Sequence, residues 1–144
     1  MPDRPPIEWR VHLNSSPGAT YEAWATDPGR ERFWAERSEA VPDGFRLSFI
    51  GGEVLDVPLV EAIPSRRFVF TYFGGSRVTV EIENDGSGGC DLHLREEGVP
   101  LAEHLENYAG WVSVLLGLKA AVDFGIDLRG HDRARSWAHG YVDN

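Results

Sequence analysis

Six stretches of the chain predict β-strands, most of them by alternating hydrophobic and polar residues and residues 67–73 by being apolar or aromatic almost throughout. The stretches are residues 7–14, 44–49, 53–63, 67–73, 77–83 and 90–97. Glycine pairs at 51–52 and 74–75 predict tight hairpins, so the later strands are expected to be antiparallel. Pro58, inside the third stretch, indicates an edge strand or a bulge, because proline cannot donate to a strand ladder.

Two short helices are predicted after the first strand. Ser16 followed by Pro17 is the pattern of an N-cap and a first helical residue. Asp27 followed by Pro28 repeats that pattern, and the second helix is expected to run to about residue 36. Helices of this length are marginal alone, so both must dock on other elements.

A long helix is predicted from Leu101 to about Asp127, after Pro100 and before Gly130, which is expected to end it in a left-handed conformation. A six-stranded sheet with one such helix must curl so that its apolar face wraps the helix. The predicted fold is therefore α+β, with a curved antiparallel six-stranded sheet around a long C-terminal helix and two short helices after the first strand.

The long helix carries an apolar stripe with a polar start. At 100° per residue the stripe comprises Trp111, Leu115, Leu118 and Val122. Asp123 is expected on the opposite, solvent-facing side. His104, Asn107 and Tyr108 extend the stripe, and polar groups in line with a core stripe often mark functional sites. The alternative is that they are partly solvated at the helix start, with the tyrosine hydroxyl reaching water.

Three apolar residues lie off the stripe, on the solvent side of the same helix: Val112, Leu116 and Phe124. Such a patch can be a homodimer contact. The competing interpretation is that the tail packs over Phe124 through Trp137 or Tyr141. The sequence leaves both open, so a homodimer through the C-terminal helix or tail stays a candidate.

Composition narrows the function classes. We expect one domain over residues 1–144, with residues 131–144 as a tail. A net charge of −9 argues against nucleic-acid and membrane partners. A single cysteine gives no disulfide framework, and the five histidines lack zinc-type spacing, so no metal and no cofactor are predicted. The N-terminus lacks an apolar signal region, so a cytoplasmic protein is expected.

Two pairs of polar residues carry no predicted chemistry. Cys90 and His93 point to opposite faces of a strand, which disfavours a nucleophile pair. Glu96 and Glu97 are neighbours on the same strand and also face opposite ways, so they do not form a glycosidase pair.

Three segments carry a family resemblance: SPGATYEAWATDPGRERFWA, GGEVLDVPLVEAIPSRRFVFTY and GWVSVLLGLKAAV. In this order they resemble the START-like helix-grip (SRPBCC) superfamily. Within it the chain is similar to the Aha-type branch, homologues of the activator of the ninety-kilodalton heat-shock chaperone ATPase. The resemblance implies a helix gripped by a curved sheet with a cavity between them. Fold alone does not give function.

Aromatic residues are expected to line that cavity. Alternation places Trp9, Phe45, Phe49, Phe68, Phe70 and Tyr72 on the concave face of the sheet. The candidate ligand-binding set is Trp9, Phe45, Phe49, Phe70, Tyr72, His104, Asn107, Tyr108, Trp111 and Leu115. Many rings with few charges suit a mostly apolar ligand. Alternatively, the rings fill the core and leave no cavity.

Three functions follow. The first is binding of a small hydrophobic or aromatic molecule in the cavity. The second, implied by the superfamily's polyketide cyclases and dehydratases, is catalysis there, with His104 as the candidate general acid or base and Tyr108 or Arg129 as helper. The third, ranked lowest, is a stress-response, co-chaperone-like interaction. The first is the prediction made from the sequence, and it leaves the ligand unidentified.

Overall fold

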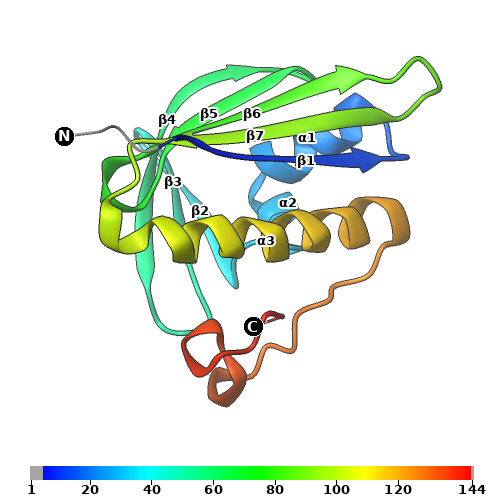
Figure 1. Cartoon of the computed structure of the whole chain (residues 1–144). Helices are drawn as coiled ribbons and strands as arrows, with labels where there is room; N and C mark the ends of the chain where they lie inside the picture. Colours follow the sequence, from blue (N-terminus) through cyan, green and yellow to red (C-terminus); the bar gives the residue numbers. More distant parts are fainter. Residues whose placement is uncertain (1–4, 144) are drawn as a thin grey trace.

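The computed structural model describes residues 5–143 and folds them into one sheet packed against helices (Figure 1). Its elements, in chain order, are β1 (Ile7–Leu13), α1 (Pro17–Ala25), α2 (Asp27–Glu31), β2 (Arg37–Val41), β3 (Gly44–Ser48), β4 (Val54–Ile63), β5 (Arg67–Thr71), β6 (Arg77–Asn84), β7 (Cys90–Glu97) and α3 (His104–Phe124). Residues 1–4, which entered the signal-peptide expectation, and residue 144, the last of the predicted tail, lie outside this range.

The sheet is open and antiparallel, with strand order β1-β7-β6-β5-β4-β3-β2. Strands β2 to β7 follow one another as a meander, and β1 pairs with β7 from Ile7 opposite Glu96 to Leu13 opposite Cys90. The sheet bends around α3, and α1 and α2 lie at one end of it (Figure 1). The predicted mixed fold, with an antiparallel sheet and a long C-terminal helix, is confirmed.

The predicted strand count of six is wrong, because the sheet has a seventh strand, β2. Its sequence, RSEAV, buries only Ser38, so the hydrophobic pattern gave no signal. The strand is held at the sheet edge by backbone pairing with β3, from Arg37 opposite Ser48 to Val41 opposite Gly44. An edge strand with one buried residue depends on its neighbour rather than on alternation.

Strand β4 carries the predicted irregularity. It pairs with β3 in its first half and with β5 in its second. The register shifts between Leu59 and Glu61, directly after Pro58. A bulge therefore lies next to Pro58, as the sequence predicts, and not at the proline itself. Pro58 pairs with Gly44 of β3, whereas the pairing of β4 with β5 begins at Leu59, so the proline has a strand partner on one side.

The two short helices start close to where the sequence predicts. Ser16 caps α1, since its hydroxyl accepts a hydrogen bond from the backbone N–H of Ala19 at 3.1 Å. Thr26, not Asp27, caps α2, and that helix ends at Glu31 rather than near residue 36. The next residues bend into the core, where Trp34 is 3% exposed, and a continued helix could not bury them all.

The long helix is shorter than predicted. A 3₁₀ turn over Leu101–Glu103 precedes α3, and the helix ends at Gly125, whose φ of 66° is the left-handed stop that was expected at Gly130. The remaining chain runs back beside the helix as a tail (Figure 1). No helix among the described residues is long and apolar enough to span a membrane.

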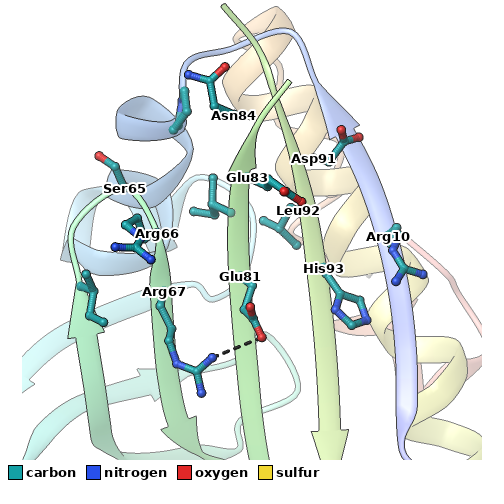
Figure 2. Close-up of a pocket in the computed structure, with 13 residues that line it drawn as sticks. Arg10, Ser65, Arg66, Arg67, Glu81, Glu83, Asn84, Asp91, Leu92 and His93 are labelled. Atoms are coloured by element: carbon teal, nitrogen blue, oxygen red, sulfur yellow. Dashed lines mark ion pairs between the residues drawn. The ribbon is translucent and has the colours of Figure 1, made fainter. Parts of the chain in front are cut away.

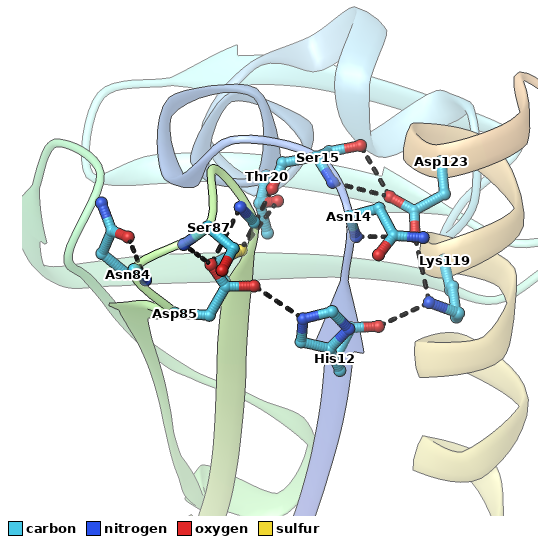
Figure 3. Close-up of polar contacts among 12 residues, drawn as sticks. His12, Asn14, Ser15, Thr20, Asn84, Asp85, Ser87, Lys119 and Asp123 are labelled. Atoms are coloured by element: carbon cyan, nitrogen blue, oxygen red, sulfur yellow. Dashed lines mark hydrogen bonds and ion pairs between the residues drawn. The ribbon is translucent and has the colours of Figure 1, made fainter.

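Asp123 fastens the end of β1 and the loop after it to the end of α3 (Figure 3). Its side chain is 1% exposed, so the predicted solvent-facing position is wrong. The carboxylate accepts hydrogen bonds from the backbone N–H of Asn14 (3.0 Å), the hydroxyl of Ser15 (2.6 Å) and the ammonium of Lys119 (3.0 Å). Burial alone raises the pKa of Asp123, but these donors outweigh it and lower that pKa to about 2.

Candidate functional site

A groove of about 470 Å³ opens beside the first half of α3, between that helix, the β3–β4 hairpin, the β5–β6 turn and the tail. Six aromatic side chains line it: Trp34, Phe49, Tyr72, Phe73, Trp111 and Trp137. Three carboxylates, Glu53, Glu103 and Glu106, also belong to the lining. The groove thus combines apolar walls with acidic groups, and its described lining contains no lysine, arginine or histidine.

Tyr72 links the groove to the aromatic core. Its ring centroid lies 5.2 Å from that of Trp111 and 5.8 Å from that of Trp34. The Trp34 indole N–H donates to the Tyr72 hydroxyl at 3.2 Å. Burial raises the pKa of Tyr72, so its phenol stays protonated at neutral pH. Its ring is therefore a neutral, half-buried wall with a fixed position.

A buried glutamate, Glu96, contacts two residues of the groove lining from the core side. Glu96 on β7 is 0% exposed, and its carboxylate accepts hydrogen bonds from Ser76 (2.6 Å), Trp111 (2.8 Å) and Asn107 (3.3 Å). Both Trp111 and Asn107 also line the groove. Among the described residues no cationic side chain forms an ion pair with Glu96, so all of its partners are neutral donors.

The sequence reasoning missed Glu96, although a signal existed. Leu92, Leu94 and Glu96 alternate along β7, and all three are fully buried. Because every second side chain of a strand lies on the same face, a glutamate two residues after a core leucine must also face the core. The prediction that Glu96 and Glu97 face opposite ways is confirmed, since Glu97 is exposed.

The tail completes one side of the groove. The indole N–H of Trp137 donates to Glu106 on α3 at 2.9 Å. Upstream, the Arg129 guanidinium donates to the backbone oxygen of Ala35 at 2.9 Å. His131 lies 2.6 Å from a carboxylate oxygen of Glu36, and hydrogen bonds to acidic neighbours, Asp127 first, raise the pKa of His131. The predicted packing of the tail over Phe124 is wrong, because Phe124 is 64% exposed.

The predicted ligand-binding residues divide into three groups. Phe49, Tyr72, Asn107 and Trp111 line the groove together. Phe45, Phe70 and Leu115 lie in the core beneath it, with exposed fractions of 3%, 0% and 3%. In this part of the molecule, therefore, the predicted alternative holds, and rings fill the core.

The third group lies on the β1 side of α3, outside the groove. The Trp9 ring centroid lies 4.7 Å from that of Tyr108, and the Trp9 indole donates to the backbone oxygen of Tyr108 at 2.9 Å. His104 lies 3.2 Å from the backbone oxygen of Pro5. Arg129, the predicted helper, follows the far end of α3 and is held at Ala35. His104 therefore has neither the groove nor Arg129 beside it.

A second hollow, of about 720 Å³, lies on the outer face of the sheet (Figure 2). Among the charged side chains that line it, Arg67 pairs with Glu81 at 3.2 Å. Arg67 also pairs with Glu61 at 2.5 Å, and His93 lies 3.0 Å from Glu8, but Glu61 and Glu8 are outside the lining. Within residues 5–143, the other charged lining residues form no ion pair: Arg10, Arg66, Glu83 and Asp91. No Phe, Tyr or Trp belongs to its described lining. The hollow mixes charges of both signs with the apolar side chains of Ile63, Ile82 and Leu92, so its lining does not indicate one ligand class.

Among the described residues no group of three or more His, Cys, Asp and Glu side chains could hold a metal ion. Cys90 is buried and His93 lies on the outer face, as the alternation of β7 predicts. Burial raises the pKa of the Cys90 thiol, which disfavours a reactive thiolate.

These features define a class: a mixed α+β protein whose open antiparallel sheet holds a long C-terminal helix and leaves an aromatic groove beside it. The family model for activator of Hsp90 ATPase homolog 1-like proteins matches residues 14–123. The chain therefore belongs to this family, and the predicted Aha-type SRPBCC resemblance is confirmed.

Solved structures agree with this assignment. A Staphylococcus saprophyticus protein is 20% identical, with 87% of this chain and 96% of that chain covered and a TM-score of 0.75. The Aha1 dimer from Colwellia psychrerythraea is 19% identical (85% and 98% covered, TM-score 0.74). DynU16, from the dynemicin biosynthetic locus, is 17% identical (85% and 48% covered, TM-score 0.72). Such identities show a shared fold, and no curated protein matches the chain.

Proposed function

We propose that this protein binds a small hydrophobic or aromatic molecule in the groove beside α3. The observation that carries the proposal is the lining itself, in which six aromatic side chains surround a space of about 470 Å³. That volume lies within the range of small-molecule sites, and Asn107 provides a polar group for orientation. Of the predicted ligand-binding residues, Phe49, Tyr72, Asn107 and Trp111 are the ones proposed to contact the ligand.

Ligand binding in the groove can be tested with a variant whose larger side chain fills the groove. Ser113 lines the groove, whereas Ala109, on the same helix, is exposed and outside it. We expect the neutral dye Nile red to gain fluorescence with the wild-type protein and with Ala109→Trp, but not with Ser113→Trp. Native mass spectrometry of the freshly purified protein would reveal a retained ligand. Equal dye binding by Ser113→Trp and the wild type would contradict binding in this groove.

Catalysis in the same groove is the second candidate, as a cyclase or dehydratase acting on a polyketide-like substrate. The fold likeness to DynU16, a protein of a biosynthetic locus, supports it. His104 is the candidate general acid or base named from the sequence, but it does not belong to the groove lining, and its ring contacts the backbone oxygen of Pro5. Turnover of a polyketide-like substrate that His104→Ala abolishes would place this candidate first.

A chaperone-directed role ranks third and rests on the family name alone. Its test is whether the purified protein changes the ATPase rate of an Hsp90-type chaperone. No change would remove this candidate.

A homodimer through α3 is a separate proposal. The residues of the predicted patch, Val112, Leu116 and Phe124, are 38%, 53% and 64% exposed. Leu105, 80% exposed, lies on the same side of the helix as Val112 and Leu116. A relative of the same fold is described as a dimer. Light scattering after size exclusion would give twice the monomer mass, and Leu105→Lys with Leu116→Lys would give the monomer mass. A monomeric wild type would refute the proposal.

A further inference from the structure

We infer that the ligand of the groove carries a positive charge, as an aromatic or aliphatic amine or quaternary ammonium. The inference rests on the proposed function, because it assigns a chemical class to the molecule bound there. It is carried by the distribution of charge around the groove together with the aromatic character of its walls.

The charged side chains in the described lining of the groove are all carboxylates. Glu53, Glu103 and Glu106 belong to the lining, and no lysine, arginine or histidine of the described residues does. Glu53 and Glu103 make no ion pair within residues 5–143. Two basic groups of the tail lie beside the groove without belonging to its lining. Arg133 Nη2 would lie 3.5 Å from a Cβ added at Gly52, and His139 Nδ1 lies 2.9 Å from the hydroxyl of Ser136, a lining residue.

Glu96 adds a buried carboxyl group next to the groove lining. Its described partners are the neutral donors Ser76, Asn107 and Trp111, so no cationic side chain forms an ion pair with it. Glu96 lies close to the groove, because two of its hydrogen-bond donors, Asn107 and Trp111, belong to the groove lining. A cation in the groove would complement the carboxylates of the lining, Glu53, Glu103 and Glu106, whereas an anion would be repelled.

The walls suit a cation as well. The rings of Tyr72 and Trp111 lie 5.2 Å apart, those of Tyr72 and Phe73 4.8 Å, and those of Phe49 and Phe73 5.8 Å. Clustered aromatic faces attract alkylammonium groups through their quadrupoles, most strongly where water is excluded. Aromatic walls with acidic groups therefore favour an organic cation over a neutral or anionic molecule of the same size.

Three probes with the same ring system separate charge from hydrophobicity: 2-naphthylmethylammonium, 2-naphthylmethanol and 2-naphthoate. In calorimetric titrations at pH 7 we expect the ammonium to bind about ten-fold more tightly than the alcohol, and the carboxylate to bind most weakly. The double variant Glu53→Gln/Glu103→Gln should reduce the preference for the ammonium several-fold. The matched control Glu83→Gln/Asp91→Asn, which removes two charges from the outer face of the sheet, should leave it unchanged.

The outcomes are distinct. If the alcohol or the carboxylate binds as tightly as the ammonium, the inference is overturned while the proposed hydrophobic site stands. An equal loss of preference in the control variant would mean that net charge alone attracts the cation, and this too overturns the inference. If no probe binds the wild-type protein at millimolar concentration, the proposed function fails together with the inference.

Discussion

Replacement of Asp123 by asparagine tests how strongly the end of β1 is tied to α3. The pKa of Asp123 is lowered from 3.8 to about 2, and each unit corresponds to about 1.4 kcal/mol. The charged form therefore contributes about 2 kcal/mol to the free energy of unfolding. Because the folded-state pKa is the lower one, this contribution is complete above about pH 5 and is lost as the pH falls through 3.8 towards 2. About half of it should be gone by pH 3.

The assay is urea unfolding of the wild type and of Asp123→Asn between pH 7 and pH 2.5, followed by tryptophan fluorescence. The variant should be less stable than the wild type by about 2 kcal/mol or more at pH 7, and the difference should shrink with falling pH. Asp91→Asn, on the exposed face of β7, is the matched control and should follow the wild type. A stability difference that stays constant with pH would refute the reasoning.

Other predictions concern packing, the groove and the thiol. Gly29→Ala should lower the free energy of unfolding by about 1–3 kcal/mol in the same urea assay, because the added Cβ would lie 2.5–2.8 Å from backbone atoms of α1. Gly18→Ala is the control and should raise that free energy, because its Cβ would lie 3.5 Å from Ser65 Oγ and alanine favours the helix. Trp137→Ala should weaken Nile red binding roughly ten-fold, and Tyr141→Ala, outside the groove, should not, so equal effects would contradict the role of the tail. Cys90, fully buried, should react with Ellman's reagent at the rate of unfolding, and fast reaction of the folded protein would contradict its burial.

The sequence predicts most of the fold because alternation and helix caps are local signals. Six strands and the start of α1 at Ser16 were accessible in this way. Strand β2 was not, since Ser38 is its one buried residue and its position comes from pairing with β3. The end of α3 was missed for a different reason: Gly125 and Gly130 are equally permissive residues, and only packing decides which one stops the helix.

The groove was harder to predict than the fold. Alternation along a strand identifies the aromatic rings on the face towards α3. Whether such a ring lines the groove or fills the core depends on segments that are distant in the sequence. Phe49 and Phe45 share a parity, yet Phe45 is 3% exposed while Phe49 lines the groove near the tail. The tail showed no periodic pattern, so its position against Glu106 could not be inferred. Glu96 was within reach of the same alternation, because it lies on the face of β7 that also buries Leu92 and Leu94.

The pairing of β1 with β7 has a consequence for how the chain folds. Strands β2 to β7 are joined in sequence, so their hairpins close short loops. Strand β1 pairs with β7, the last strand of the chain, and α3 packs against β1. Contacts between such distant segments slow folding. Refolding should therefore end in a slow phase in which the N-terminal strand is added to the edge of the sheet beside β7. The fluorescence of Trp9, on β1, should report that phase.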